Sequence, residues 1–387
     1  MRFELATASR IVFGPGTVRE VASAARSMGT CALMVTGRSQ ARAATVTEEW
    51  DASGLRYVRF SVTGEPTIQT AREGAELARN ERCDVVVSVG GGSAVDAGKA
   101  IAALIGNGGD PLDYLEVIGE GRKLERSPVP FIAVPTTAGT GSEVTRNAVL
   151  GSPEHGVKAS LRSPLMLPDL AVVDPELTVD VPPAVTATTG LDALTQLIEP
   201  YVSSRSNAMT DLYCLEGIRR AAGSLKRAYE DGRDAEARND MAMASLMGGL
   251  SLANAGLGVV HGFAAPVGGM FTAPHGAVCA AILPHGMRGN IQALRERGED
   301  SDKLERYQTV ARLLTGSENA QTEDGIEWAF RTCEELGIPT LAAYGLRPDD
   351  VPAVVQKASR ASSMKANPIE LTTEELTEIL SNALYGP

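Results

Sequence analysis

The sequence predicts an α/β domain built on a parallel, Rossmann-like sheet, followed by an all-α domain. Through the first half of the 387 residues, short β-type runs alternate with helix-type stretches, which is typical of a parallel sheet covered on both faces. After a series of prolines that ends at Pro182 and Pro183, long stretches rich in Ala, Leu, Glu and Arg replace the β-branched runs. We therefore expect an α/β domain over 1–180 and a helical domain over 181–387.

The elements of the first domain follow from the length of each run and the turn residues that bound it. Strands are predicted at 32–35, 57–60, 85–89, 131–134 and 171–173. Helices are predicted at 17–27, 41–53, 68–82 and 94–105. This order brings the carboxyl ends of the strands to one edge of the sheet, where open α/β sheets bind nucleotides.

The composition argues against several classes of protein. The net charge of −12 and the scattered Lys and Arg argue against nucleic acid or anionic lipid as a partner. The first residues lack the apolar run of a signal peptide. Five cysteines, with no CxxC spacing, are typical of reduced thiols. We expect a cytoplasmic protein that contacts neither nucleic acid nor a membrane.

One stretch, from Met241 to Met287, contains no Lys, Arg, Asp or Glu. A membrane span needs about 20 predominantly apolar residues, and glycines, Pro266 and Pro274 interrupt every such window here. We interpret the stretch as helices buried at the centre of the second domain. Three of the four histidines of the chain lie inside it: His261, His275 and, near its end, His285.

Two loops that follow predicted strands could hold a phosphate. Residues 90–93 read Gly-Gly-Gly-Ser and open a helix, and Ser93 and Asp96 have the spacing of a capping box. A helix N-terminus with glycines admits a phosphate, although a simple strand-to-helix turn would use the same residues. The second loop, 135–143, is rich in hydroxyls and glycine. Together the loops favour a nucleotide site, although the GxGxxG spacing is absent.

Four polar residues of the second domain could form a metal site. Asp192 and Gln196 are four apart in a predicted helix and share a face, although Asp192 could equally be a carboxylate in the first turn. His261 and His275 could be hydrogen-bonded core residues. With Asp192 they would also form a carboxylate–imidazole set that suits Fe²⁺ or Zn²⁺. The spacing leaves both interpretations open.

Several motifs, in order over essentially the whole chain, resemble the iron-containing (group III) alcohol dehydrogenases. They are GGGSxxDxxK at 90–99, TTAGTGSE at 136–143, GLDAL at 190–194, VHG at 260–262, PHG at 274–276 and SMKANP at 363–368. The resemblance implies the dehydroquinate synthase-like architecture of that family, with the active site in the cleft between an α/β and a helical domain. It also implies hydride transfer between NAD(P)(H) and an alcohol/aldehyde pair, with Fe²⁺ or Zn²⁺ bound.

The same resemblance assigns residues by motif. The residues on the pyrophosphate and nicotinamide side would be Gly91, Gly92, Ser93 and Asp96. The cofactor would also be lined by Thr136, Thr137 and Ser142. Lys158 would lie near the nicotinamide ribose. Asp192, His261 and His275 match three of the four usual metal ligands and, with Lys158, would be the catalytic residues.

The chain departs from the family pattern at two positions. The usual second histidine ligand is Gln196, and a histidine that many members place at the substrate is Ala265. These changes keep two alternatives open. One is a metal-independent reductase or transhydrogenase acting on an oxo-acid, as in maleylacetate reductase. The other is a catalytically silent nucleotide-binding sensor.

The residues after the strand at 32–35 bear on the choice of dinucleotide. Family members that prefer NAD often carry an acid there, whereas this chain reads Gly37-Arg38-Ser39, with Arg42 nearby. We expect Gly37 to line the cofactor and NADP(H) to be accepted at least as well as NAD(H), unless Gly37 is only a turn residue. The resemblance and the long uncharged stretch also imply a homodimer.

Overall fold

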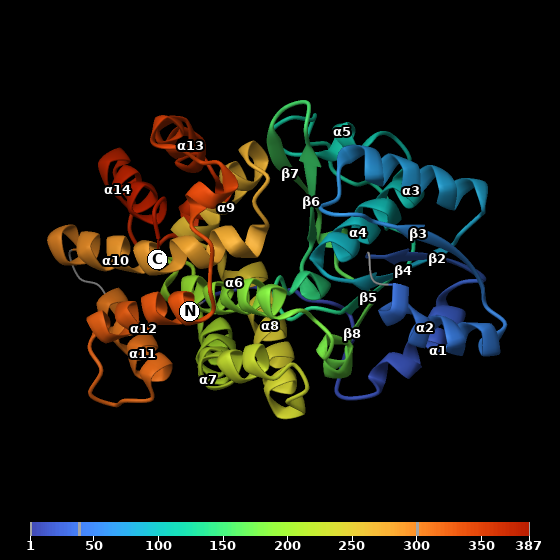
Figure 1. Cartoon of the computed structure of the whole chain (residues 1–387). Helices are drawn as coiled ribbons and strands as arrows, with labels where there is room; N and C mark the ends of the chain where they lie inside the picture. Colours follow the sequence, from blue (N-terminus) through green and yellow to red (C-terminus); the bar gives the residue numbers. More distant parts are fainter. Residues whose placement is uncertain (1, 38–39, 299–301, 387) are drawn as a thin grey trace. The chain divides into compact units, whose positions relative to one another are not determined.

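The chain divides into two compact units in a computed structural model that describes residues 2–37, 40–298 and 302–386 (Figure 1). The first unit, the α/β unit, comprises Ala6–Thr137 and Gly141–Val179. The second, the helical unit, comprises Met1–Leu5, Ala138–Thr140 and Asp180–Pro387.

The α/β unit is built on a six-stranded sheet in which every pairing is parallel. Its strands, in spatial order, are β1 (Ile11–Phe13), β8 (Leu170–Val173), β5 (Phe131–Pro135), β4 (Val85–Gly90), β2 (Cys31–Thr36) and β3 (Arg56–Ser61). The predicted parallel sheet is confirmed. Only the short edge strand β1 was not predicted.

Helices cover both faces of this sheet. Helices α1 (Val21–Met28) and α2 (Gln40–Ser53) pack on one face, and α3 (Ile68–Asn80) and α4 (Gly92–Asn107) pack on the other (Figure 1). Successive side chains of a strand point to opposite faces, so neighbouring residues of β2 enter different cores. Met34 packs with α1 and α2, whereas Leu33 packs with α4.

An antiparallel hairpin in the α/β unit was not predicted. Strands β6 (Asn147–Ser152) and β7 (Val157–Arg162) pair along their whole length. Their buried residues alternate, and Leu150 and Leu161 pack with residues of α3 and α4. The hairpin therefore adds a third layer outside α4. A short helix, α5 (Pro111–Tyr114), contributes to the same core.

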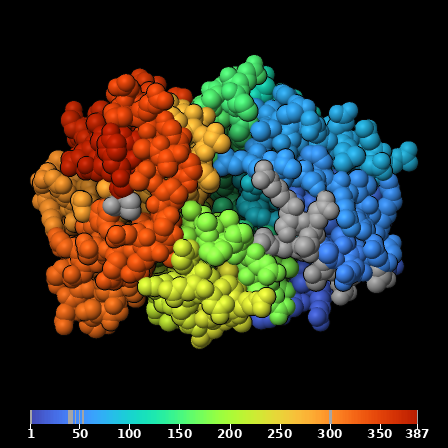
Figure 2. Space-filling view, viewed as in Figure 1, coloured from blue at the N-terminus to red at the C-terminus, as the bar shows by residue number. Residues whose placement is uncertain are grey.

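The helical unit consists of helices around one large apolar core. They are α6 (Pro183–Val202), α7 (Ala208–Glu230), α8 (Ala235–Ala255), α9 (Val259–Met270), α10 (His275–Arg297), α11 (Asp302–Thr315), α12 (Thr322–Glu335), α13 (Val351–Ala358) and α14 (Thr373–Ala383). Short 3₁₀ turns over both units span Thr17–Glu20, Ser142–Val144, Pro164–Met166, Pro175–Thr178, Leu341–Tyr344, Pro348–Asp350 and Ser362–Ala366. The space-filling view shows the C-terminal helices at the surface of this unit (Figure 2).

The uncharged stretch forms the end of α8, all of α9 and the start of α10. Most of its side chains are buried in the core of the helical unit. Among the described helices, none is long and apolar enough to cross a membrane alone. The pair α8 and α9 passes that test of length and composition together, but the two helices are bent by 98°.

Candidate active site

Three residues expected in a metal site lie together in the helical unit, and a fourth, unexpected residue joins them. The ligand atoms of Asp192, His261, His275 and Cys279 all lie within 4.8 Å of one another. Nε2 of His261 is 3.3 Å from Oδ1 of Asp192, and Nε2 of His275 is 3.7 Å from the same oxygen. We call these four residues the ligand cluster.

Asp192 lies in the middle of α6. This helix begins early, because Pro183 occupies its first position, where a missing N–H costs nothing. The interpretation of Asp192 as a first-turn carboxylate is therefore wrong. Its side chain is 1 % exposed. Gln196, one turn later on the same face, is also buried, and both side chains point away from solvent.

His261 is held by residues distant in sequence. Its Nδ1 lies 2.7 Å from Oε2 of Glu199, and the other oxygen of that carboxylate accepts the N–H of Val260. Asn367 accepts the N–H of Val259, so two side chains cap the start of α9. A carboxylate can only accept from the ring, so Nδ1 carries the proton and the Nε2 lone pair faces Asp192.

His275 occupies the first position of α10, after Pro274. Cys279 follows four residues later and therefore lies on the same helix face. The Cys279 Sγ is 3.7 Å from Nε2 of His275. The His275 side chain is 36 % exposed, whereas Asp192 and His261 are almost fully covered. The cluster is thus open to solvent on the side of His275.

Three buried polar atoms at this site lack hydrogen-bond partners: Oδ1 of Asp192, Oε1 of Gln196 and Nε2 of His261. Leaving such atoms unsatisfied costs roughly 1–3 kcal/mol each, so a site that gathers them needs a ligand. All three carry lone pairs, which suit a cation and not an anion. The donors present therefore fit a divalent metal.

Charge inside the cluster shifts the pKa of its members. Burial alone would lower the pKa of the His261 imidazole, but its interactions with Cys279, Glu199 and Asp192 outweigh burial and hold that pKa well above its usual value. Burial likewise opposes the charge of Asp192, yet the imidazoles of His275 and His261 hold the pKa of its carboxyl below the usual value. A cation is thus favoured here, whether a proton or a metal.

In the α/β unit, the predicted cofactor residues meet at the carboxyl edge of β2, β4 and β5. The N–H of Thr136 donates to the carbonyl of Gly90. A Cβ at Gly90 would lie 2.6 Å from the Cβ of Ala94 and 3.1 Å from the nitrogen of Gly37, and one at Gly91 would lie 3.2 Å from Oγ1 of Thr137. A side chain at Gly90 would therefore clash, and the loops approach one another closely along one edge.

Helix α4 begins at Gly92, with Gly91 as its N-cap and no side-chain cap. The capping box predicted for Ser93 and Asp96 is therefore wrong. The amino end of a helix of this length, next to glycine loops, keeps its first N–H groups free of a competing side chain. This arrangement is suited to a phosphate.

Asp96 and Ser142 bond to each other and to Lys99. The Ser142 hydroxyl donates to Oδ1 of Asp96, whose Oδ2 accepts the N–H of Val149. The buried Lys99 ammonium lies 2.7 Å from the Ser142 hydroxyl, 3.0 Å from Oγ1 of Thr145 and 3.2 Å from Asp96. We call Lys99, Asp96, Ser142 and Thr145 the lysine network. It ties α4 to the segment before β6.

Lys158, on β7, forms an ion pair with Glu65, and its side chain is only 9 % exposed. The structure therefore places it in the α/β unit with a carboxylate partner. The other expected cofactor residue, Gly37, directly follows β2, but Arg38 and Ser39 lie outside the described residues, as does the side chain of Arg42.

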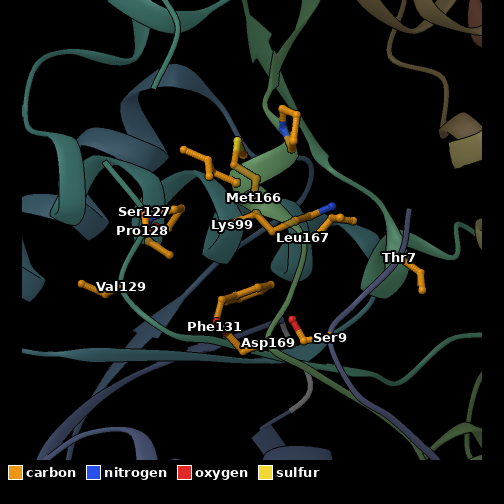
Figure 3. Close-up of a pocket in the computed structure, with 13 residues that line it drawn as sticks. Thr7, Ser9, Lys99, Ser127, Pro128, Val129, Phe131, Met166, Leu167 and Asp169 are labelled. Atoms are coloured by element: carbon orange, nitrogen blue, oxygen red, sulfur yellow. Dashed lines mark hydrogen bonds between the residues drawn. The ribbon is translucent and has the colours of Figure 1, made fainter. Parts of the chain in front are cut away.

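A pocket of about 240 Å³ opens at the opposite edge of the sheet (Figure 3). Phe131 begins β5 and Asp169 precedes β8, so the pocket lies at the amino ends of the strands. The aliphatic stem of Lys99 also lines it. Because the glycine loops lie at the carboxyl edge, this pocket is separate from the expected cofactor residues.

Two residues of this site, Glu199 and Cys279, were not predicted from the sequence. Glu199 shares a helix face with Asp192 and Gln196, at positions i, i+4 and i+7, and that periodicity could have identified it. Cys279 follows His275 by four residues, the spacing of two ligands on one helix face. It was interpreted only as a reduced thiol.

Comparison with known proteins places the chain. Residues 8–175 match the family model "Iron-containing alcohol dehydrogenase", and residues 186–384 match "Fe-containing alcohol dehydrogenase family, C-terminal". Alcohol dehydrogenase 4 of Saccharomyces cerevisiae is 34% identical over 383 residues, 96% of each chain.

Two solved structures are similar over almost the whole chain. A 1,3-propanediol oxidoreductase has a TM-score of 0.91 and 32% identity, and the match covers 99% of this chain and 100% of that one. A sulfoacetaldehyde reductase from Bifidobacterium kashiwanohense, in complex with NAD⁺, has a TM-score of 0.86 and 29% identity over 99% of both chains.

The α/β unit and the helical unit thus define an oxidoreductase that acts on CH–OH groups. The chain belongs to the iron-containing alcohol dehydrogenase family. The resemblance noted from the motifs is confirmed.

Proposed function

We propose that the protein is an NAD(P)-dependent alcohol dehydrogenase or aldehyde reductase whose substrate oxygen is polarised by a divalent metal. Asp192, His261 and His275 would hold the metal, with Gln196 beside them. The observation that carries this proposal is the set of buried lone pairs without partners, on Asp192, Gln196 and His261. They fit Fe²⁺ or Zn²⁺ by donor type.

When bound, the metal supplies a Lewis acid that stabilises negative charge on the substrate oxygen. The residues around the site would orient the ligands of this metal and set its electrostatic surroundings. Glu199 keeps the proton of His261 on Nδ1, which leaves Nε2 free to ligate. Asp192 contributes a negative charge among uncharged walls, where its interaction with a cation is weakly screened.

The α/β unit would bind the dinucleotide. The start of α4, with Gly91, Gly92 and Ser93, would accept the pyrophosphate. Thr136 and Thr137 lie on the adjacent loop, within reach of the same ligand. When bound, the nicotinamide supplies the hydride. We assign Lys158 to the nicotinamide ribose, and its burial against Glu65 supports a fixed position for its ammonium group.

For Asp96 and Ser142 the structure favours a supporting role. Asp96 already accepts from Ser142 and Val149, and these bonds hold the loop that follows β5. We therefore propose that both residues act on the cofactor through the position of this loop and of the start of α4.

The test compares protein stripped of metal with protein reloaded with Zn²⁺ or Fe²⁺, using NADPH and a panel of aldehydes and keto acids. We expect aldehyde turnover that is lost on stripping and restored by metal. If an oxo-acid were turned over at a rate that neither stripping nor reloading of the metal changes, the protein would instead be the metal-independent reductase. Cofactor binding without any turnover would indicate the sensor.

The dinucleotide preference is part of this proposal. No acid follows β2 at positions 37–39, so a 2′-phosphate would meet no carboxylate from this segment. We expect kcat/KM with NADPH to be at least equal to that with NADH. A strong preference for NADH would show that the adenosine end is recognised elsewhere.

We also propose a cytoplasmic homodimer. Five free, buried cysteines are typical of a reducing compartment, and the likeness to the family supports a dimer. Light scattering at micromolar concentration should give twice the chain mass of 40.6 kDa. A stable monomer would contradict the dimer.

A further inference from the structure

Cys279 is the member of the ligand cluster that the resemblance does not assign. At position 196 the chain carries a neutral amide where the family usually carries an imidazole. In the same cluster, a thiol lies 3.7 Å from Nε2 of His275 and within 4.8 Å of the other ligand atoms. The cluster thus lacks the imidazole that the family usually has at position 196, and it contains the thiol of Cys279 as a further donor.

The observed distances match those between the ligands of one tetrahedral metal. With bonds of about 2.0–2.1 Å to N or O and about 2.3 Å to S, neighbouring ligands would lie roughly 3.3–3.6 Å apart. The separations are 3.3 Å between His261 and Asp192 and 3.7 Å from His275 to both Asp192 and Cys279, and all four ligand atoms lie within 4.8 Å of one another. Shifts of about 1 Å would therefore bring the thiol and the other three groups onto one metal.

Two other thiols of the helical unit have different surroundings. Cys333 donates to the carbonyl of Ala280, and burial raises its pKa to about 12. Burial also raises the pKa of Cys214 to about 12. Neither thiol belongs to the ligand cluster. Cys279 instead contacts His275, one of the expected metal ligands.

We propose that Cys279 is the fourth protein donor to the metal, in place of the imidazole missing at position 196, and that it makes the site selective for Zn²⁺ over Fe²⁺. This inference rests on the proposed metal site. On binding, the thiol loses its proton to solvent and its sulfur lone pair forms the bond to the metal. A thiolate is a soft donor. Zn²⁺ binds such a donor more favourably than do ions that prefer carboxylate ligands.

The proposed donors are the Asp192 carboxylate, a Cys279 thiolate and two neutral imidazoles, with the buried carboxylate of Glu199 behind His261. The exposed side of His275 leaves an approach for substrate, as a fifth ligand or in place of a weak one.

The test uses Co²⁺ in place of Zn²⁺, because a thiolate ligand gives Co²⁺ an intense charge-transfer band in the near ultraviolet that N and O ligands do not give. The variants are Cys279→Ser and, as a matched control, Cys214→Ser. We expect the band in the wild type and in the control, and its loss in Cys279→Ser. Zn²⁺ affinity should fall by about 10- to 100-fold in that variant.

A second variant, Gln196→His, restores the usual donor. In that background Cys279→Ser should cost much less Zn²⁺ affinity than in the wild type, because the two donors replace each other. Equilibrium competition should show that Cys279→Ser also narrows the preference for Zn²⁺ over Fe²⁺.

The outcomes separate this inference from the proposed function. Wild-type protein that binds Co²⁺ with visible d–d bands but no thiolate band would overturn the role of Cys279 and leave the metal site intact. Failure of the wild type to bind Co²⁺, Zn²⁺ or Fe²⁺ would overturn both.

Discussion

Two buried polar clusters, one in each unit, have opposite character. In the lysine network, the ammonium of Lys99 lies among five oxygens, and both oxygens of Asp96 accept hydrogen bonds. In the ligand cluster, Asp192 and His261 are equally buried, yet each has an atom without a partner. The sequence singles out residues of both clusters with similar strength.

The difference lies in whether the protein itself satisfies its buried groups. A satisfied network fixes two segments against each other and has no valence left for a ligand. An unsatisfied set is a cost in the free protein that a bound cation removes. A structural cluster therefore differs from a binding site less in burial or charge than in whether its buried polar atoms have hydrogen-bond partners within the protein.

The largest effect is expected from Lys99→Met. This change leaves Asp96 partly buried without its cation, which costs about 3–5 kcal/mol when a buried pair is broken. We expect the free energy of unfolding in urea to fall by that amount. Zn²⁺ affinity of the folded variant should stay unchanged, since the ligand cluster is untouched. A loss of affinity with unchanged stability would reverse the roles given to the two clusters.

His261→Ala should have the opposite pattern. Removing one of the metal ligands should lower Zn²⁺ affinity by more than about 100-fold, which is more than the usual effect of changing an outer partner. Turnover should be lost with it. Metal content after dialysis, together with kcat/KM, measures both effects. Full activity in metal-free His261→Ala would contradict the metal site.

Glu199→Gln tests the support behind His261. Its amide can still accept from the ring, but it lacks the charge that favours ligation through Nε2 and can present its NH₂ group to Val260. We expect a loss of about 10- to 100-fold in Zn²⁺ affinity, or about 1.4–2.8 kcal/mol. Glu216→Gln, on the exposed face of α7, is the control and should leave affinity unchanged.

The last effect is the pH dependence of metal binding. Because the pKa values of His261 and His275 are raised, protons compete with metal at neutral pH. Zn²⁺ affinity should therefore rise with pH, by up to about tenfold per unit for each proton released. Competition titrations between about pH 6 and 8 would measure it.

The stability of the metal-free protein should change with pH in the opposite sense to the metal affinity. A histidine whose folded pKa is raised contributes stability that is fully present below its unfolded value of about 6.5 and is lost as pH rises through the raised pKa. The free energy of unfolding without metal should thus fall with rising pH. Parallel slopes with and without metal would indicate that these imidazoles do not bind it.

Much of the fold could be predicted because most of its strands and helices follow from patterns within short segments of the sequence. Five of the six strands of the parallel sheet were predicted from short β-type runs bounded by turn residues, and each strand lies where its run lies. The hairpin of β6 and β7 contains Asn, Ser, Lys and Arg and buries only alternate residues, so its apolar pattern is weak. The turn at Pro153 and Gly156, where φ is +58°, was the clearer indication.

The site was predicted only as far as side-chain type reveals chemistry. Asp192, His261 and His275 are conspicuous in an uncharged core, and the structure brings them together. Glu199 shares the helix face of Asp192, but this position alone does not reveal its role, which depends on a bond to His261, 62 positions away. Cys279 was overlooked because a thiol alone does not distinguish a ligand from a core residue.

The start of α9 has a consequence for the order in which the protein is made. Asn367 accepts the N–H of Val259, although the two residues are 108 positions apart. A ribosome therefore releases all the histidines of the cluster well before it releases the side chain that fixes the helix carrying one of them. The proposed metal site would thus be complete only after synthesis has reached this segment, and in a nascent chain arrested before Asn367 the proposed ligands would be present without the contact that caps α9.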